Sequence, residues 1–276
     1  GDTSAKATGL HTVANQKGGV GKTTTTVAIA GYLASQGYRT LMLDLDPQGS
    51  LTTYVQQNPD NVVGTAYDIF DRQDRVHTRG ADFPNLELIG GSIGLAQLEK
   101  KSDSIKGKGL VVDSFVRTLE GKFDYVLIDT PPALGLLMVG ALVASEQLVV
   151  PVQTDFLALK GLERMIKVLT MLGSSSLAIN DKILPTMFDK RTNASKRTLI
   201  SLKNQYGERV SPIRAPTDTK FRDASRMGVP PGVLFPRCQG VEAYQRFVRF
   251  LLESRAAEKQ SQGGACRVEA TLAAHE

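Results

Sequence analysis

The sequence predicts an α/β protein built on a doubly wound, mostly parallel sheet with helices on both faces. Apolar segments typical of buried strands alternate with segments of helical periodicity along most of the chain. A glycine-rich run ending in Gly21-Lys22-Thr23 lies between the first such strand and the first helix. Two later apolar segments end in aspartates, Asp44 and Asp129. Ligands of open parallel sheets bind where the strands end, so these groups predict a site at that edge.

Length and composition fit a globular protein with a full core. The chain has 276 residues, of which 41% are hydrophobic. It contains no run of about 18 apolar residues, so no membrane-spanning helix is expected. The N-terminus lacks the pattern of a secretory signal. Two cysteines, Cys238 and Cys266, do not make a disulfide framework, so a reducing, cytoplasmic compartment is expected.

The first elements supply the context that a phosphate-binding loop requires. Residues 1–9 are polar and small and are expected to form a flexible arm. A strand is predicted at Leu10–Ala14, a helix at Lys22–Ser35 ending before Gly37, and a buried strand at Thr40–Asp44. Strand, glycine-rich loop, helix and strand then follow one another in the required order.

The remaining elements are predicted from apolar segments bounded by glycine, proline or charged residues. Residues 51–70 look helical or mixed. Strands are expected at 86–89, 123–129, 147–153, 183–188 and 210–213, and helices at 93–99, 111–119, 162–172, 196–206 and 241–255. From residue 258 to 276 the chain is polar and small, which predicts a disordered tail. Residues 10–257 are therefore expected to form a single domain.

The loop residues suit the binding of phosphate. Glycines allow successive backbone N–H groups to turn towards phosphate oxygens, and the following helix directs its positive end at the anion. Lys22 adds a charge near the β- and γ-phosphates, and the Thr23 hydroxyl can ligate Mg²⁺. The general pattern G-x-x-x-x-G-K-[ST] is met except at its first glycine, where Gln16 stands, and a second lysine, Lys17, follows.

Aspartates follow two of the predicted strands. Asp46, two residues beyond Asp44, can reach Mg²⁺ or a water near the γ-phosphate. The alternative is that Asp44 and Asp46 only cap the turn before Pro47. Asp129 ends an apolar strand in the Walker B pattern, whose carboxylate holds Mg²⁺ through water. An apolar strand that ends in aspartate is weak evidence for a metal site by itself. It becomes strong evidence when it follows a Gly-Lys-Thr loop in the same chain.

Three motifs resemble those of the ParA/MinD family of ATPases. They are the deviant Walker A loop K-G-G-V-G-K-T-T at 17–24, D-x-D-P-Q-G at 44–49 (switch I) and D-x-P-P at 129–132 (switch II). The resemblance covers roughly residues 10–255 and is closest to short, Soj-like ParA proteins and orphan cargo-positioning proteins. It implies a P-loop NTPase fold, ATP and Mg²⁺ as cofactors, and hydrolysis of ATP to ADP and phosphate.

The resemblance also assigns roles to residues. Asp46 orients the attacking water, and Lys17 reaches across an ATP-dependent homodimer to the partner's nucleotide. Because no arginine finger is evident in cis, a monomer is expected to hydrolyse ATP slowly. Mg²⁺ is expected at Thr23, Asp46 and Asp129, and catalysis is assigned to Lys17, Lys22 and Asp46. Nucleotide contacts are expected from Lys17, Gly18, Gly19, Val20, Gly21, Lys22, Thr23 and Thr24, with the base near Asp189, Pro216 and Asp218.

Positive charge is concentrated in one segment. Residues 182–226 hold 11 Lys/Arg against 4 Asp/Glu, a net charge of +7. On charge alone this segment is as readily an ordinary solvated face. The resemblance implies sequence-independent, salt-sensitive DNA binding by the ATP dimer, and hence association with the nucleoid. The candidate DNA contacts are Arg191, Lys220, Arg222 and Arg226.

The predicted function is a ParA-like ATPase that segregates or positions a cargo, with hydrolysis stimulated by a ParB-like protein or a cargo adaptor. The cargo can be a plasmid, a chromosome origin or a protein cluster such as chemoreceptors. One alternative is a MinD-like membrane ATPase, but residues 241–255 look more like a docked core helix, so no stable membrane insertion is expected. A metabolic ligase on the same fold is a second alternative, in which Lys17 would lack its usual purpose.

Overall fold

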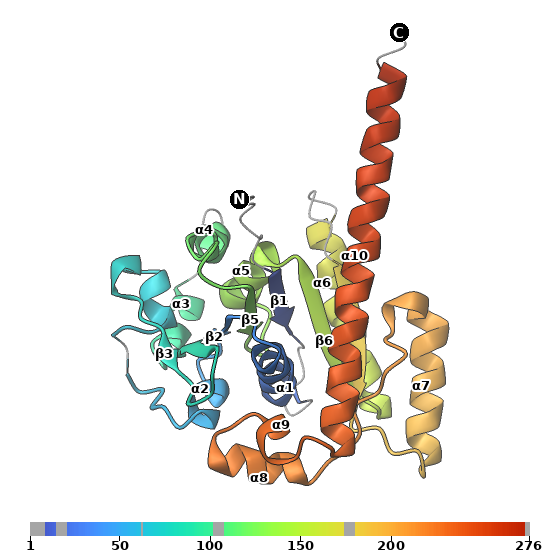
Figure 1. The fold of residues 1–276 in the computed structure, drawn as a ribbon, viewed down its shortest axis with the longest axis horizontal. Helices are drawn as coiled ribbons and strands as arrows, with labels where there is room; N and C mark the ends of the chain where they lie inside the picture. Colours follow the sequence, from blue (N-terminus) through green and yellow to red (C-terminus); the bar gives the residue numbers. More distant parts are fainter. Residues whose placement is uncertain (1–8, 15–20, 62, 102–107, 174–179, 274–276) are drawn as a thin grey trace.

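A parallel sheet forms the centre of the molecule (Figure 1). The computed structural model describes residues 9–14, 21–61, 63–101, 108–173 and 180–273. Within them the sheet has seven strands in the order β3-β4-β2-β5-β1-β6-β7, and only β3 runs antiparallel to its neighbour. The strands are β1 (Gly9–Val13), β2 (Thr40–Asp44), β3 (Arg79–Gly80), β4 (Leu86–Ile89), β5 (Tyr125–Asp129), β6 (Gln147–Gln153) and β7 (Asn180–Thr186). The predicted fold class is confirmed.

Helices connect the strands and cover the sheet. The α-helices are α1 (Lys22–Ser35), α2 (Ser50–Tyr54), α3 (Leu95–Lys100), α4 (Val111–Arg117), α5 (Leu136–Ala144), α6 (Phe156–Gly173), α7 (Asn193–Tyr206), α8 (Lys220–Met227), α9 (Pro231–Leu234) and α10 (Gln239–Ala273). Short 3-10 turns are η1 (Ala66–Ile69), η2 (Gln73–Arg75), η3 (Lys108–Leu110) and η4 (Gly207–Arg209).

Successive residues of the central strands point into different cores. In β2, Met42 packs with side chains of α1 and α10, whereas Leu41 and Leu43 pack with side chains of α4 and α5. The same alternation occurs in β6, where Val149 joins the first core and Leu148 a third core under α6. Strands buried on both faces are characteristic of a parallel sheet between two helical layers.

The strand register places the chemically important residues at one edge. Asp44 at the end of β2 and Val13 at the end of β1 are both register partners of Asp129 at the end of β5. The loop between β1 and α1 and the segments after β2 and β5 therefore leave the sheet side by side.

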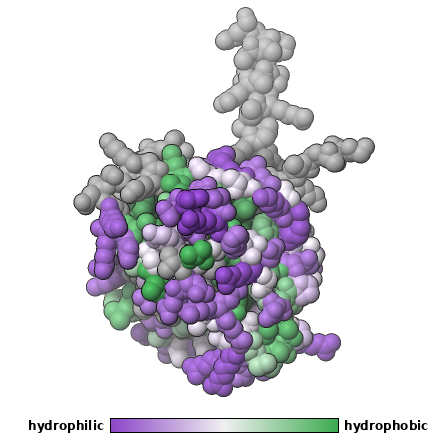
Figure 2. Space-filling model, turned by 90° about the vertical axis from the view of Figure 1, so that its left-hand side faces the viewer, coloured by the Kyte–Doolittle hydropathy of each residue, from purple (hydrophilic) through white to green (hydrophobic). Residues whose placement is uncertain are grey.

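The β3 edge of the sheet ends in a strand of only two residues, Arg79 and Gly80, both exposed. Figure 2 shows this side of the molecule as mainly hydrophilic, with scattered hydrophobic side chains. Short, charged edge strands do not readily pair with another chain, so this edge is poorly suited to extending the sheet.

Several predicted elements differ from the structure. Residues 210–213 form only a single bridge, between Val210 and Ile183, because Pro212 interrupts a longer ladder. Helices α5 and α8 have no counterpart in the prediction. Helix α8 is only eight residues long and half of its side chains are charged, with Ala224 as its one buried residue.

Helix α10 begins two residues before the predicted 241–255 helix and continues to Ala273, through most of the segment predicted as a tail. Figure 1 shows its C-terminal part projecting beyond the rest of the fold. Alanine, glutamate, glutamine and arginine in this part favour helix over coil. The first half is docked, since Tyr244, Phe247 and Leu251 are buried against α1 and the sheet. In the described parts of the chain, no helix has the length and apolarity that a bilayer crossing needs.

Docking of α10 makes a first prediction. Replacement of Phe247 by alanine should lower the free energy of unfolding by about 3–5 kcal/mol, because this fully buried ring would leave a cavity. Urea denaturation measures the loss. The exposed Arg249→Ala on the same helix is the control and should change stability by less than about 0.5 kcal/mol. Equal effects of the two substitutions would show that the helix is not docked.

Candidate functional site

Lys22 lies at the start of α1, directly after the loop. Its side chain is buried, and its ammonium donates a hydrogen bond to the Thr130 carbonyl oxygen at 3.1 Å. The Thr130 hydroxyl in turn donates to the Val13 carbonyl oxygen at 2.9 Å. These contacts join α1, β1 and the segment after β5 into one unit. The predicted contacts Lys17, Gly18, Gly19 and Val20 lie outside the described residues.

Thr23 and Asp129 form the centre of the predicted metal site. The Thr23 hydroxyl donates to Asp129 Oδ2 at 2.8 Å. Asp129 is 1% exposed, and within the described structure its other oxygen, Oδ1, has no hydrogen-bond partner. Burial, and then repulsion by Asp44, raise the pKa of Asp129 to about 7. A hydroxyl beside an unsatisfied carboxylate oxygen is the kind of oxygen donor set that Mg²⁺ prefers, so these residues fit the ion.

Asp46 lies in the loop after β2 and is also nearly buried. Its Oδ1 accepts a hydrogen bond from the Gln48 backbone N–H at 2.9 Å, so it does cap the turn. Asp46 also lines a cavity of about 460 Å³ together with the start of α1. The cavity is lined by Gly21, Lys22, Thr23, Thr24, Asp46, Gln48, Ser50, Pro132 and Met187. The structure thus brings the described Walker A residues and Asp46 to one cavity of ligand size.

Asp44 plays a different part from Asp46. It is fully buried and accepts three hydrogen bonds: from the Asp46 N–H, the Thr52 N–H and the Thr52 hydroxyl. The Thr52 hydroxyl accepts from the Gly91 N–H at 2.7 Å. A Cβ on Gly91 would lie 2.8 Å from the Asp44 carboxyl carbon, so only glycine fits there. Burial raises the pKa of Asp44 to about 6. Asp44 therefore holds the loop that carries Asp46.

A second cavity, of about 280 Å³, lies beside the end of β7. It is lined by Phe188, Asp189, Lys190, Arg191, Pro216, Thr217 and Gln239. Two of the residues predicted near the base, Asp189 and Pro216, are among them. The third, Asp218, does not line this cavity. It accepts hydrogen bonds from the backbone N–H groups of Lys220 and Gly240, and so joins the starts of α8 and α10.

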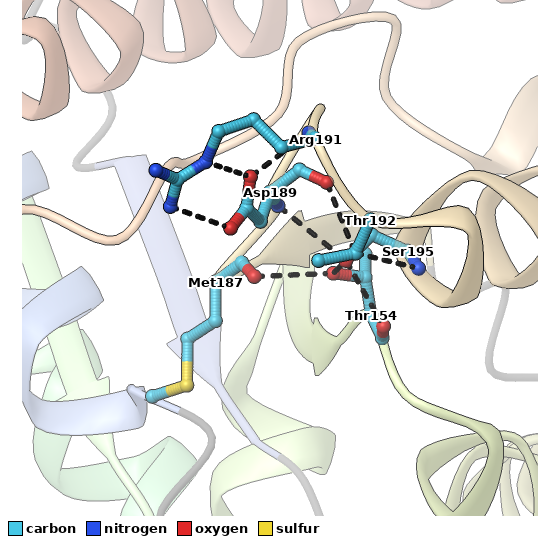
Figure 3. Close-up of polar contacts among 6 residues, drawn as sticks. All are labelled: Thr154, Met187, Asp189, Arg191, Thr192 and Ser195. Carbon is cyan, nitrogen blue, oxygen red and sulfur yellow. Dashed lines mark hydrogen bonds and ion pairs between the residues drawn. The ribbon is translucent and has the colours of Figure 1, made fainter.

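Residues 187–189 connect the two cavities (Figure 3). The Thr154 hydroxyl donates to the Met187 carbonyl oxygen at 3.3 Å, and Ser195 Oγ accepts from the Asp189 N–H at 3.4 Å. Met187 has the uncommon φ of 52°, and its side chain extends towards α1, where it lines the larger cavity. Its neighbour Phe188 lines the smaller one. The two cavities are thus positioned relative to each other by a short, hydrogen-bonded segment.

The candidate DNA contacts fall into two groups. Lys220, Arg222 and Arg226 are exposed on α8, at the end of the molecule where α9 also lies (Figure 1). Arg191 precedes α7 and binds Asp189 through two bonds, Nε to Oδ1 at 3.0 Å and Nη2 to Oδ2 at 2.9 Å. This pairing lowers the pKa of Asp189 to about 2. Arg191 therefore belongs to the smaller cavity as well as to the surface.

Three residues in these networks escape prediction from the sequence: Thr52, Thr130 and Met187. Thr130 adjoins Asp129, and its position one residue after the strand is a usable signal. Thr52 acts on residues eight positions before it and 39 after it, so its role appears only in three dimensions. Met187 carries no polar group, and the sequence offers no sign of its place in the cavity wall.

Comparisons with known proteins agree with this geometry. Residues 10–184 match the protein family described as AAA domain. The sporulation initiation inhibitor protein Soj of Bacillus subtilis is 33% identical over 237 residues, which cover 84% of this chain and 93% of Soj. The chromosome partitioning protein ParA of Myxococcus xanthus is 29% identical, over 87% of each chain.

Solved structures show the same fold. Cobyrinic acid a,c-diamide synthase from Mycobacterium smegmatis, with bound ADP and magnesium, has a TM-score of 0.77 and 29% identity, over 91% of this chain and 96% of its own. Cyanothece McdA has a TM-score of 0.77 at 22% identity, over 87% and 98%, which supports the fold alone. The family match over more than half of the chain and the Soj relative decide the assignment. The chain belongs to the ParA/MinD family of ATPases.

Proposed function

We propose that the chain is a Soj-like ATPase that hydrolyses ATP with Mg²⁺ to segregate or position a cargo. The Thr23–Asp129 pair beside Lys22, at a cavity of about 460 Å³, carries this proposal. Thr23 and Asp129 would hold Mg²⁺, which neutralises phosphate charge when bound. Lys22 would exchange the Thr130 carbonyl oxygen for phosphate oxygens. Asp46, which lines the same cavity, would orient the attacking water.

An ATP-dependent homodimer is part of the proposal. Phe156 and Leu157 begin α6, just beyond the carboxyl end of β6, and are 72% and 69% exposed. Leu134, after β5, is 42% exposed on the same edge of the sheet. Large apolar side chains exposed at the sheet edge where the ligand cavity lies support burial by a second copy. Lys17 of that copy would then complete the site, and an activating protein would raise its rate.

Non-specific DNA is the proposed track, and nucleoid association would follow. The basic side chains of α8 and Arg191 support this, because phosphate contacts need exposed cations and no particular base. The MinD-like alternative has less support, since the apolar face of the first half of α10 is buried in the protein core. The ligase alternative draws on the 29% identical synthase and predicts ATP turnover only with a carboxylic acid and an amine donor.

The DNA proposal makes a second prediction. DNA binding should require ATP, be absent with ADP or without nucleotide, and weaken steeply between 50 and 200 mM salt, as about six phosphate contacts would give. Arg222→Glu with Arg226→Glu should weaken binding about tenfold or more at low salt, while Lys167→Glu on α6 should not. Filter binding to a random duplex measures this. DNA binding that depends neither on the nucleotide nor on Arg222 and Arg226 would refute the proposal.

Hydrolysis makes a third prediction. Asp46→Asn should lower kcat for ATP about 100-fold or more and leave ATP affinity within a few-fold, because the carboxylate acts on the water rather than on bound ATP. Phosphate release without any organic co-substrate measures it and tests the ligase alternative at once. The exposed Asp60→Asn, outside the cavity, is the matched control. A wild-type protein that never releases phosphate without a co-substrate would favour the ligase.

The raised pKa of Asp129 makes a fourth prediction. Its folded pKa of about 7 exceeds the ordinary value of 3.8, so the carboxyl stabilises the metal-free fold when protonated. That stability is present below about pH 4 and is lost as pH rises through 7, by on the order of 4 kcal/mol in full. Urea unfolding without Mg²⁺ at pH 5 and pH 8 should show the loss in wild type and in Asp60→Asn, and a flatter profile in Asp129→Asn. Parallel profiles for all three proteins would contradict the prediction.

A further inference from the structure

The segment between β5 and α5, residues 131–135, passes along the larger cavity and is here named the strap. Its first end is fixed at the nucleotide side. Asp129 is bonded to Thr23, and Thr130 is bonded both to the Lys22 ammonium and to the Val13 carbonyl oxygen. Pro132 of the strap lines the cavity, and Leu134 is exposed.

Glu99, on helix α3, fixes the other end of the strap. The backbone N–H of Leu136 donates to Glu99 Oε2 at 3.0 Å, and the N–H of Leu137 donates to Oε1 at 2.9 Å. Both donors belong to the first turn of α5, whose N–H groups have no partner within the helix. The carboxylate charge also favours this position, because a helix N-terminus is positive. Glu99 therefore caps α5 from a different element, 37 residues earlier in the chain.

The absence of a side chain at Gly135 makes room for the Glu99 carboxylate. A Cβ at this position would overlap Glu99 Oε2 and lie only 2.7 Å from the carboxyl carbon. Close approach of the carboxylate to the backbone thus requires glycine at the last residue of the strap. Two independent observations place Glu99 against the strap. Both of its carboxylate oxygens accept hydrogen bonds from α5, and Gly135 leaves space for them.

Nucleotide binding would change a bond at the first end of the strap but none of the Glu99 bonds at the second end. If Lys22 takes up phosphate charge, as the proposed function requires, its bond to Thr130 is given up and the first end loses one of the three bonds that hold it. No described contact of Glu99 with Leu136 and Leu137 involves the cavity, so the second end stays in place. Pro132 and Leu134 thus lie between an end whose bonds change and an end whose bonds stay the same.

We propose that Glu99 is a positioning residue for ATP hydrolysis. By holding the N-terminus of α5, it fixes the strap so that Asp129 stays beside Thr23 and Pro132 stays in the cavity wall when Lys22 changes partner. Glu99 is not among the described residues that line the cavity, and in this role it does not touch the reacting atoms. The inference rests on the proposed ATPase function and adds a residue to it.

Steady-state kinetics test this role. Glu99→Ala should lower kcat about tenfold or more and change KM for ATP less than about threefold, since misplacement acts on the reacting geometry rather than on ATP affinity. Glu99→Gln keeps one acceptor oxygen and should give an intermediate kcat. The exposed Gln97→Ala on the same helix is the control and should match wild type. A wild-type kcat in Glu99→Ala, or a fall in which KM changes as much as kcat, would overturn the proposal.

A double-mutant cycle separates the contact from a general loss of structure. Gly135→Ala should impair kcat because its methyl group displaces the carboxylate. In Glu99→Ala the carboxylate is already absent, so adding Gly135→Ala should cause little further loss. Coupled residues show this non-additivity, whereas independent ones multiply their effects. Multiplied losses would refute a shared contact.

A fluorescence measurement tests the role of Glu99 even if the protein does not hydrolyse ATP. The chain has no tryptophan, so Leu134→Trp gives a single reporter on the strap. Its emission should respond to a non-hydrolysable ATP analogue, and Glu99→Ala should abolish or at least halve that response at saturating analogue. An identical response in both backgrounds would overturn the role of Glu99. Failure of the wild type to hydrolyse ATP would instead refute the proposed function, and the reporter would still judge Glu99.

Discussion

Two carboxylates in a dry environment are the constraint around which the nucleotide edge is organised. Asp44 and Asp129 are register partners on adjacent strands, and each is at most 1% exposed. Burial of one ionised carboxylate is costly, and two near each other repel as well. The protein meets this cost in two ways. Asp44 receives three hydrogen bonds, whereas Asp129 receives one from Thr23 and keeps one oxygen unsatisfied. The less satisfied carboxylate is the one suited to a cation.

The loops around the two carboxylates are held by side chains that are distant in the sequence. Thr52 lies in α2 and contacts both Asp44 and the backbone after β4, so the loop that carries Asp46 is tied to two strands. Thr154 and Ser195 hold the segment after β7 in the same manner. Each support is an uncharged hydroxyl that satisfies backbone groups without adding charge near the phosphate cavity. Rigid supports of this kind keep reacting groups in place at little energetic cost during the reaction.

Much of this could be predicted from the sequence because the relevant signals are local. Helix α1 and strands β2, β4 and β6 have the predicted bounds, since each is an apolar or periodic run between clear stop signals. Asp46 and Asp129 were predicted because each is an aspartate at or just after a strand end, and Lys22 and Thr23 because they end the glycine-rich loop before the first helix. Neither signal applies to Met187 or Glu99. Their positions depend on which distant segments the sheet order brings together, and neither has a local pattern of its own. Asp218 lies only two residues after Pro216 but does not line the smaller cavity, because its carboxylate instead joins the starts of α8 and α10.

The Lys22–Thr130 bond connects the nucleotide cavity with the strap. A buried ammonium needs a partner, and in this structure the Thr130 carbonyl oxygen, at 3.1 Å, is one. Phosphate would be the stronger partner, because its oxygens carry a charge opposite to that of the ammonium, whereas the carbonyl oxygen is neutral. Exchange of partners would free a carbonyl oxygen that directly precedes the strap, while the hydroxyl of the same residue stays bonded to Val13. Occupancy of the cavity would thereby be coupled to the segment that carries Pro132 and the exposed Leu134. A site built in this way can report bound nucleotide at its surface without any large rearrangement of the sheet.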